Sequence, residues 1–360
     1  MPKETERRFI LPGVTPSAVL TNPRELTQGY LNTPPHSIFR VRETAGNQFE
    51  MTTKLGHGVA REEENCELNE QQFHFIYQAC PYPLAKRRAD CGVWTVDTYH
   101  GPLQGLVCIE DEAAPGAPFP AWVDPALAIE VTNTVTNYDL ARLARELTHN
   151  PLHGGMTVYT FLKASVEMPM DVVTGPPCSG KSKALVELNE KFGEQIHFVP
   201  EAASIIIGTV GVPFPAGDAF AIARFQQSLA TIQRSFEFLA KTEAIRSGKL
   251  GVVLDRGDVD CAAYLPNGLD DFEVLTQTDR TYAYSRYSSV FCLEIPSRAI
   301  YEQHKADNLV RRESYEEACA LGEAMQRVWC GHPNYTFIRN ADSWEAKFET
   351  IRNAFLRKIA

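Results

Sequence analysis

The sequence predicts two domains of different fold class. We expect a β-rich domain over residues 1–166 and an α/β domain with a parallel sheet over residues 167–360. In the first part, apolar and polar residues alternate with the period of β-strands. In the second part, short apolar runs alternate with longer helical patterns, which is typical of a parallel sheet covered by helices. The chain has 360 residues, enough for two domains that each bury a core.

Composition limits the classes of function. Apolar residues make up 44% and charged residues 22% of the chain, as in ordinary globular proteins. The net charge of −10 disfavours general binding to nucleic acid or to anionic membranes. No apolar run reaches membrane-spanning length, and residues 1–6 do not resemble a signal peptide. The nine cysteines form no C-x-x-C pair, which indicates reduced thiols without a structural zinc site. We expect a cytoplasmic protein with no membrane insertion and no stable nucleic-acid binding.

Residues 175–182 have the pattern G-x-x-x-x-G-K-S. An apolar run at 170–174 predicts a strand before them, and residues 183–190 have helical periodicity. In such a loop, glycines let backbone N–H groups point at phosphate oxygens, the lysine reaches the β/γ-phosphates and the serine can ligate Mg²⁺. We therefore expect ATP or GTP, with Mg²⁺, at this loop. Its predicted binding residues are Gly175, Pro176, Pro177, Cys178, Ser179, Gly180, Lys181 and Ser182.

The rest of the second domain follows the same alternation. Asp255 ends an apolar run at 250–255, and the carboxyl end of such a strand is where a carboxylate that supports Mg²⁺ belongs in a phosphate-loop protein. Glu201 follows another predicted strand at 195–199. A further strand is predicted at 288–295, and helices are predicted at 221–247, 316–329 and 344–359.

Charged pairs at positions i and i+2 recur along the predicted strands of the first domain. Since strand side chains alternate, each pair lies on one face. If these faces converge, they line a lumen with an acidic cluster, which suits Mg²⁺ or Mn²⁺, and a basic cluster, which suits phosphate. A solvated strand face is the alternative for any single pair. The sets are Glu4, Glu6 and Arg8; Arg40 and Arg42; Thr52 and Lys54; Arg61, Glu63, Asn65 and Glu67; Lys86 and Arg88; and Glu110 and Glu112.

These residues carry a family resemblance over about residues 3–163. Glu4-x-Glu6-x-Arg8 resembles the E-x-E-x-K signature of the CYTH domain, also called the triphosphate tunnel metalloenzyme fold. The resemblance implies a closed eight-stranded antiparallel tunnel that binds a triphosphate and a divalent metal. The last signature position is Arg8 rather than lysine, and a guanidinium does not replace a compact ammonium fully. Later matches are Arg40-x-Arg42, Thr52-x-Lys54, Glu67, Lys86-x-Arg88, Glu110-x-Glu112 and the E-V-T segment at 129–132.

The resemblance implies roles for these residues in metal-assisted hydrolysis of a triphosphate. Metal would be held by Glu4, Glu6, Glu110 and Glu112. Phosphate oxygens would be neutralised by Arg8, Arg40, Arg42, Lys54, Lys86 and Arg88, with Arg8, Lys54 and Lys86 in catalytic positions. Either Glu63 or Glu67 would orient the attacking water, and the sequence does not choose between them.

The second domain resembles the AAA_28 family, P-loop domains related to nucleoside and nucleotide kinases, over about residues 170–358. The resemblance rests on the loop at 175–182, Glu201 within 200–203, Asp255 within 255–257, and Arg311 with Arg312. It implies that Glu201 lies near the phosphoryl acceptor or its metal and that Arg311 or Arg312 is a lid arginine. The alternatives are an acid near a helix N-terminus for Glu201 and a solvated helix start for the two arginines.

Together the motifs predict a bifunctional phosphate-chemistry protein. The first domain would hydrolyse an inorganic, nucleoside or thiamine-type triphosphate, and the second would bind a nucleotide and transfer phosphoryl groups as a kinase does. An RNA 5′-triphosphate end stays open as a substrate. One alternative is a class IV-type adenylate cyclase in the tunnel. Another is a non-catalytic adaptor that senses nucleotide and phospholipid.

Overall fold

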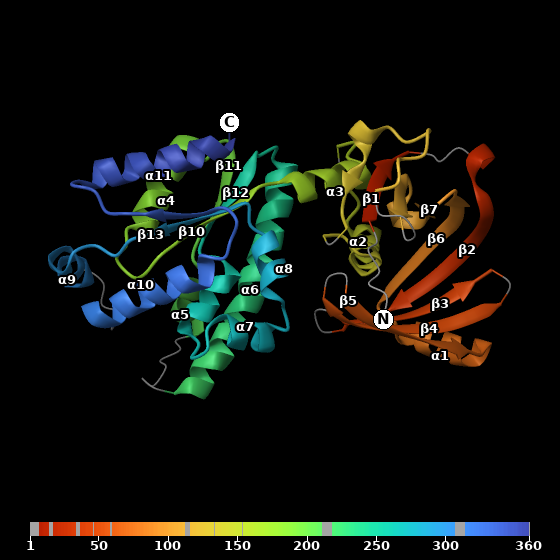
Figure 1. The fold of residues 1–360 in the computed structure, drawn as a ribbon, viewed down its shortest axis with the longest axis horizontal. Helices are drawn as coiled ribbons and strands as arrows, with labels where there is room; N and C mark the ends of the chain where they lie inside the picture. The colour runs from red at the N-terminus through yellow and green to blue at the C-terminus, as the bar shows by residue number, and fades with distance from the viewer. Residues whose placement is uncertain are drawn as a thin grey trace. The chain divides into compact units, whose positions relative to one another are not determined.

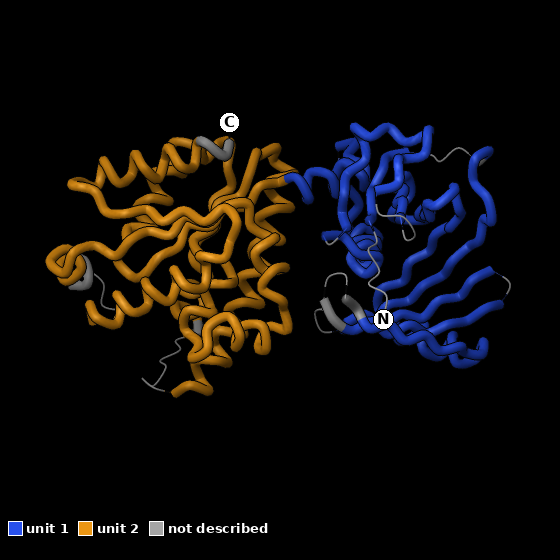
Figure 2. The backbone as a smooth tube through the Cα atoms, in the orientation of Figure 1, with its two compact units in different colours: residues 1–167 blue, residues 168–360 orange. Residues whose placement is uncertain are grey.

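The computed structural model describes residues 7–13, 17–33, 37–45, 47–57, 60–111, 116–132, 134–152, 154–210, 218–306 and 314–359. The chain divides into two compact units, Met1–Glu167 and Met168–Ala360 (Figure 2). Glu4, Glu6, Glu112, Arg311 and Arg312 lie outside the described residues.

Unit 1, residues 1–167, is built on one antiparallel sheet of nine strands, in the order β5-β4-β3-β2-β6-β7-β8-β1-β9 (Figure 1). Most strands pair with a strand next to them in the sequence. Strand β1 instead pairs with β8 and β9, which lie far from it in the sequence. The strands are β1 (Arg7–Pro12), β2 (Thr21–Tyr30), β3 (Ser37–Thr44), β4 (Gln48–His57), β5 (Ala60–Leu68), β6 (Tyr82–Cys91), β7 (Trp94–Tyr99), β8 (Leu106–Asp111) and β9 (Ile129–Glu130).

The antiparallel sheet predicted for the first domain is confirmed, with two differences. Nine strands are present rather than eight, and no pairing between β5 and β9 joins the described strands into a ring. Strand β2 was not predicted from the sequence, because Pro23, Gly29 and its polar residues interrupt the apolar alternation that marks a strand. Near the end of this unit the chain forms helix α3 (Val158–Glu167).

The two faces of this sheet differ. Helix α1 (Glu70–Ala79) begins at a capping box between Asn69 and Gln72, and its Phe73 packs against Val41 and Phe49. Because strand side chains alternate, the charged neighbours of Val41 on β3 point to the opposite face. Helix α2 (Asn137–His149) lies on that other side, where its first turn contacts the charged residues. Short 3-10 turns are η1 (Ser17–Val19), η2 (Gly101–Leu103) and η3 (Pro125–Leu127).

Unit 2, residues 168–360, has a five-stranded parallel sheet in the order β11-β12-β10-β13-β14 (Figure 1), which confirms the predicted α/β class. Its strands are β10 (Met170–Thr174), β11 (Ile196–Val199), β12 (Gly251–Asp255), β13 (Ser289–Leu293) and β14 (Tyr335–Ile338). The helices are α4 (Lys181–Phe192), α5 (Ala202–Val210), α6 (Ala219–Arg246), η4 (Asp258–Tyr264), α7 (Leu269–Thr276), α8 (Arg280–Ser285), α9 (Arg298–Ala306), α10 (Tyr315–Trp329) and α11 (Trp344–Ile359).

The central strands of this sheet are covered on both faces. Val172 and Leu254 lie in the core on one face, while Val173, Val253 and Phe291 lie in the core on the other. Strands buried on both faces are continuous apolar runs, which is why the sequence pattern located them. The parallel strands bring their carboxyl ends to one edge of the sheet, where the loop after β10 begins. Within the described residues, no helix has the length and apolar character to cross a bilayer.

Candidate functional site

The loop between β10 and α4 has the backbone of a phosphate cradle. Gly175 and Gly180 have φ of +141° and +95°, and a Cβ on Gly175 would lie 2.5 Å from the Leu293 carbonyl oxygen. A Cβ on Gly180 would meet the Trp344 ring at the same distance, 2.5 Å. Only glycine combines a positive φ with the absence of a Cβ, and both are required at these positions. Helix α4 begins directly after Gly180, so its N-terminal N–H groups face the loop.

Lys181 is held over this loop in a buried position. Its Nζ donates to the carbonyl oxygens of Gly175 and Pro176 at 2.8 and 2.9 Å. Burial, together with the nearby Arg256 charge, lowers the pKa of Lys181 to about 8. Its hydrogen bonds go to carbonyl dipoles, and phosphate oxygens would compensate its charge better than these carbonyls do. Ser182, next on the helix, is exposed.

Two predicted carboxylates lie beside the loop. Asp255 ends β12 and pairs with Val173 of β10, and Glu201 follows the neighbouring strand β11. Burial raises the pKa of Asp255 to about 6, and its Oδ1 is buried without a hydrogen-bond partner among the described residues. A buried carboxylate oxygen without a hydrogen-bond partner is a suitable ligand for a hard divalent cation. The residues present therefore fit a Mg²⁺ ion. A carboxylate that is buried away from water is stabilised when a cation binds it.

Arg256 and Asp260 extend this cluster, and the sequence reading gave neither a role. Arg256 has φ of +74°, unusual for a residue other than glycine, and its Nε donates to Glu201 Oε1 at 2.6 Å. Its Nη1 lies 3.6 Å from Asp260 Oδ1, and Asp260 also accepts from Thr174. Burial opposes ionisation of Glu201, but Arg256 and Lys181 outweigh it and lower its pKa to about 2. Glu201 is therefore ionised near neutral pH and pairs with Arg256.

The predicted phosphate ligands of unit 1 share one face of the sheet. Cross-strand register puts Arg40 opposite Tyr30 and Thr52, and puts Lys54 opposite Glu63.

The same face continues where Arg88 pairs with Asp97 and where Arg8 pairs with Glu110. Directly opposed residues project to the same side, so strands far apart in the sequence contribute to one surface. Arg42, Glu67 and Lys86 lie on it as well.

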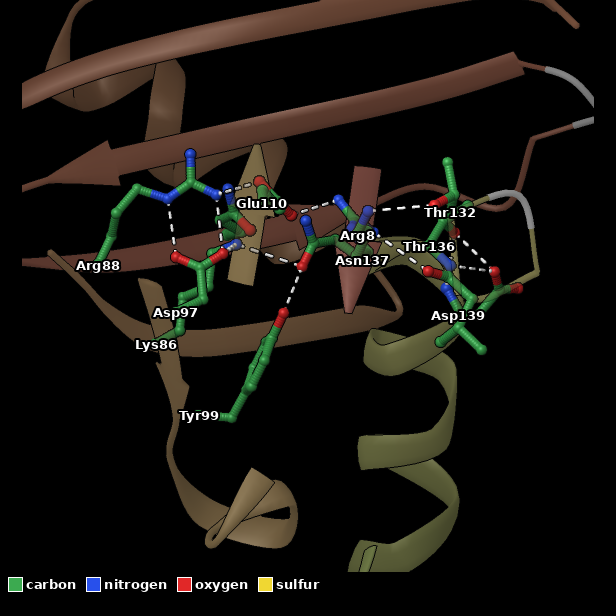
Figure 3. Close-up of polar contacts among 12 residues, drawn as sticks. Arg8, Lys86, Arg88, Asp97, Tyr99, Glu110, Thr132, Thr136, Asn137 and Asp139 are labelled. Atoms are coloured by element: carbon green, nitrogen blue, oxygen red, sulfur yellow. Dashed lines mark hydrogen bonds and ion pairs between the residues drawn. The ribbon is translucent and has the colours of Figure 1, made fainter. Parts of the chain in front are cut away.

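A buried ion network forms the centre of this surface (Figure 3). Asp97, fully buried, accepts from Lys86 Nζ at 2.5 Å and from Arg88 Nε and Nη2 at 2.7 Å each. Arg88 Nη2 also lies 3.0 Å from Glu110 Oε2, and Arg8 Nη2 lies 2.5 Å from Glu110 Oε1. Burial opposes ionisation of both carboxylates, but the surrounding cations hold the pKa of Asp97 and of Glu110 below the ordinary range.

The first turn of α2 completes the network. Asn137 Oδ1 accepts from Lys86 Nζ at 3.2 Å and from the Tyr99 hydroxyl at 2.7 Å, and Arg8 Nη1 donates to the Val135 carbonyl at 3.2 Å. The capping box of Thr136 and Asp139 fixes this helix start (Figure 3). Lys86 is 1% exposed, so its amine is held within the network and is not presented at the surface.

A second group of ion pairs lies on β3, β4 and β5. Arg42 Nη2 donates to Glu50 Oε1 at 2.8 Å, and Lys54 Nζ lies 2.5 Å from Glu63 Oε2. Arg40 donates to the Thr52 hydroxyl at 2.9 Å and lies 3.9 Å from Glu50. Glu50 was not predicted as a site residue. Its position two residues before Thr52 was the available signal, because i and i+2 share a strand face.

The predicted metal site of unit 1 is represented here by Glu110 alone, since Glu4, Glu6 and Glu112 lie outside the described residues. Both oxygens of Glu110 face arginines. In the described ranges, no group of three or more His, Cys, Asp or Glu residues has the arrangement of a metal site. The Mg²⁺ or Mn²⁺ expected in this unit thus stays a prediction from the sequence.

Comparisons with known proteins agree with the loop geometry of unit 2. The AAA_28 family model, described as an AAA domain, matches residues 171–347, which confirms the predicted P-loop domain. No curated protein matches the chain.

Two kinds of solved structure resemble the chain. The inorganic triphosphatase NE1496 is 26% identical with a TM-score of 0.30, and the match covers 39% of this chain and 95% of that one. Another structure of NE1496, described as a hypothetical protein, is 27% identical with a TM-score of 0.30, over 38% and 97% of the two chains. NadR protein in complex with NR is 15% identical with a TM-score of 0.42, over 61% of this chain and 59% of that chain.

Proposed function

We propose that the chain is a bifunctional phosphate-chemistry enzyme. Unit 2 binds a nucleoside triphosphate, ATP or GTP, with Mg²⁺ and transfers its terminal phosphoryl group as a kinase does. Unit 1 binds a small triphosphate and hydrolyses it with the help of a divalent metal. The observation that carries the proposal is the loop of unit 2, where Lys181 and Asp255 lie beside a glycine-built cradle at the end of β10.

In unit 2 the chain supplies positioning and charge. Backbone N–H groups at the start of α4 would receive the phosphates, and Lys181 would exchange its two carbonyl acceptors for phosphate oxygens. Asp255 and Ser182 would hold Mg²⁺, which supplies electrostatic neutralisation of the phosphates when bound. Glu201, with a pKa of about 2, is too weak a base to take a proton near neutral pH. It would instead hold the Arg256 guanidinium beside the reacting phosphoryl group.

In unit 1 the chain supplies a cationic surface. Arg40, Arg42 and Lys54 are partly exposed, with side-chain exposures of 14%, 24% and 24%, and can reach a bound anion. The attacking water forms a bond to the terminal phosphorus while the anhydride P–O bond breaks, giving phosphate and pyrophosphate from tripolyphosphate. Lys54 and Asn65 engage Glu63 and lower its pKa against the effect of burial, which favours Glu67 as the water-orienting carboxylate.

Nucleotide binding is tested by isothermal titration calorimetry with ATP and GTP in the presence of Mg²⁺. Lys181→Ala should abolish binding to unit 2, and Lys191→Ala, an exposed lysine at the other end of α4, should bind as wild type. Equal affinity in the wild type and Lys181→Ala would overturn the proposal for unit 2.

Hydrolysis in unit 1 is tested by product analysis with tripolyphosphate, ATP and thiamine triphosphate. We expect phosphate release that depends on Mg²⁺ or Mn²⁺ and is lost in Glu4→Ala/Glu6→Ala. Formation of cyclic nucleotide and pyrophosphate from ATP would identify a cyclase instead. Tight binding of triphosphate with no product would identify an adaptor.

A further inference from the structure

The amine of Lys347, on the first turn of α11, is bound in three directions. The residue is 5% exposed. Its Nζ donates to the carbonyl oxygen of Ser179 at 3.0 Å, to that of Glu294 at 3.0 Å and to Asn340 Oδ1 at 2.8 Å. An ammonium has three donors, so each of them has an acceptor. The acceptors come from the phosphate loop, the end of β13 and the connection from β14 to α11.

The acceptors of Lys347 are themselves fixed. Asn340 donates from its Nδ2 to the Ile295 carbonyl at 2.6 Å, and its backbone N–H donates to Glu294 Oε2 at 2.6 Å. Lys347 therefore connects the phosphate loop to a rigid support at the carboxyl end of the sheet. A loop carbonyl bound in this way cannot rotate unless it breaks a charge-assisted hydrogen bond.

Trp344 contacts the next residue of the loop from the same helix turn. Its ring occupies the place that a Cβ on Gly180 would need, 2.5 Å away. Its Nε1 donates to Glu187 Oε1 at 2.6 Å, and Lys183 Nζ lies 4.6 Å from the ring centroid. The first turn of α11 thus contacts two consecutive loop residues, Ser179 and Gly180.

Peptide geometry links the Lys347 contact to phosphate binding. The peptide unit between Ser179 and Gly180 is planar, and no cis peptide bond occurs among the described residues. Its C=O and N–H therefore point in opposite directions. When Lys347 binds the C=O, the N–H of Gly180 is aimed away from Lys347, and the orientation of this donor is set before any ligand arrives.

The position of the amine also argues for a role beyond packing. Burial lowers the pKa of Lys347 to about 8, against the opposing charge of Glu294. An apolar side chain of similar length would fill the space without the desolvation penalty of a buried ammonium. The buried charged group lies where it binds the phosphate loop directly.

We propose that Lys347 is a positioning residue of the nucleotide site, which sets the peptide orientation of the phosphate loop through the Ser179 carbonyl. The inference rests on the proposed nucleotide binding of unit 2. Lys347 does not touch the reacting atoms, so its loss should weaken binding of the phosphates more than it slows chemistry.

The test compares Lys347→Met, Lys347→Arg and Lys191→Met in the full chain. Lys191 is an exposed lysine of α4 whose Nζ lies 5.1 Å from the Phe348 ring of α11, so its variant removes a contact to α11 without touching the loop. Calorimetry with Mg-ATP should give an affinity at least tenfold weaker for Lys347→Met, with partial recovery in Lys347→Arg. Lys191→Met should bind as wild type. Turnover should show a raised KM with kcat changed less than threefold.

Several outcomes separate this inference from the proposed function. Wild-type affinity in a folded Lys347→Met protein would overturn the inference alone, provided that Lys181→Ala no longer binds. A fall in kcat as large as the rise in KM would also overturn it, because it would place Lys347 in the chemical step. If Lys347→Met does not fold, Lys347→Arg decides: weaker Mg-ATP binding at an unchanged Tm supports the inference, and wild-type binding contradicts it. A wild type that binds no nucleotide would instead overturn the proposed function.

Discussion

The two units arrange the cations of their proposed phosphate sites in opposite ways. In unit 2, a single lysine rests on backbone carbonyls, and the loop around it is shaped by glycines at positive φ. In unit 1, side chains from many strands carry the charge, and carboxylates such as Asp97 and Glu110 already pair with the cations. A backbone cradle is local in sequence and needs few charges. A side-chain surface is assembled from distant strands and needs internal counter-ions to be stable before a ligand binds.

The largest effect should come from breaking the buried pairs of unit 1. Asp97→Asn leaves Lys86 and Arg88 buried without their main counter-charge, which should destabilise unit 1 by about 3–5 kcal/mol. Urea denaturation followed by hydrogen-exchange mass spectrometry of unit 1 peptides measures the change. The matched control is Asp90→Asn, whose pair with Arg24 spans 3.4 Å between half-exposed side chains and should matter by less than about 1 kcal/mol. Equal effects of both variants would contradict the distinction.

Removal of the Lys181 amine should have the next largest effect, and only in unit 2. Lys181→Ala should lower the rate of nucleotide turnover at least on the order of 10²–10³-fold, because the ammonium would bind the nucleotide and stabilise the transferring phosphoryl group. Tripolyphosphate hydrolysis by unit 1 should be unchanged in the same protein. Steady-state phosphate release from each substrate measures both, and a parallel loss of both activities would show that the two sites are not separate.

The pH dependence of nucleotide binding should be bell-shaped. Asp255 has a pKa raised to about 6, so it is protonated at lower pH and Mg-ATP affinity should fall about tenfold per pH unit well below 6. Lys181 has a pKa lowered to about 8, so it loses its charge above that pH and affinity should fall again. Calorimetry between pH 5 and 9 measures this, and Asp255→Asn should flatten the acid limb only. A profile without an acid limb in the wild type would contradict the role of Asp255.

The smallest predicted effect concerns Glu50, which pairs with Arg42 and lies near Arg40. Glu50→Gln removes a negative charge that competes with the substrate for these arginines. KM for tripolyphosphate should therefore fall about two- to fivefold, the size expected from the interaction energy of a partly exposed ion pair. Glu64→Gln changes an exposed carboxylate on the other face of β5 and should leave KM unchanged. An unchanged or higher KM in Glu50→Gln would show that Arg42 is not available to the substrate.

The difference between the units also explains what could be predicted from the sequence. The loop at 175–182 is contiguous, and the apolar run of β10 and the Asp255 position follow simple patterns, so these were located directly. The partners of Asp97 are on a different strand from it, and only the observed register of β6 and β7 shows the pairing. Strand β2 was missed because a proline and a glycine interrupt its alternation.

Contacts that only the tertiary structure creates are harder still to predict. Lys347 has the sequence context of an ordinary amphipathic helix, and its acceptors are two carbonyl oxygens and an amide that tertiary structure brings together. Arg256 adopts a left-handed backbone that residue type does not favour, and its partner Glu201 is on another strand end. Nothing in local propensity indicates either contact.

The central claim is that the chain has two separate phosphate sites. The most direct test measures phosphate release from tripolyphosphate and ATP, with Mg²⁺ or Mn²⁺, in the wild type, Lys181→Ala and Glu4→Ala/Glu6→Ala. If the two sites are separate, tripolyphosphate hydrolysis survives the lysine change and is lost with the glutamates. Loss of that activity with Lys181 and its survival in the glutamate variant would show that they are not, and would leave unit 1 as a binding module at most.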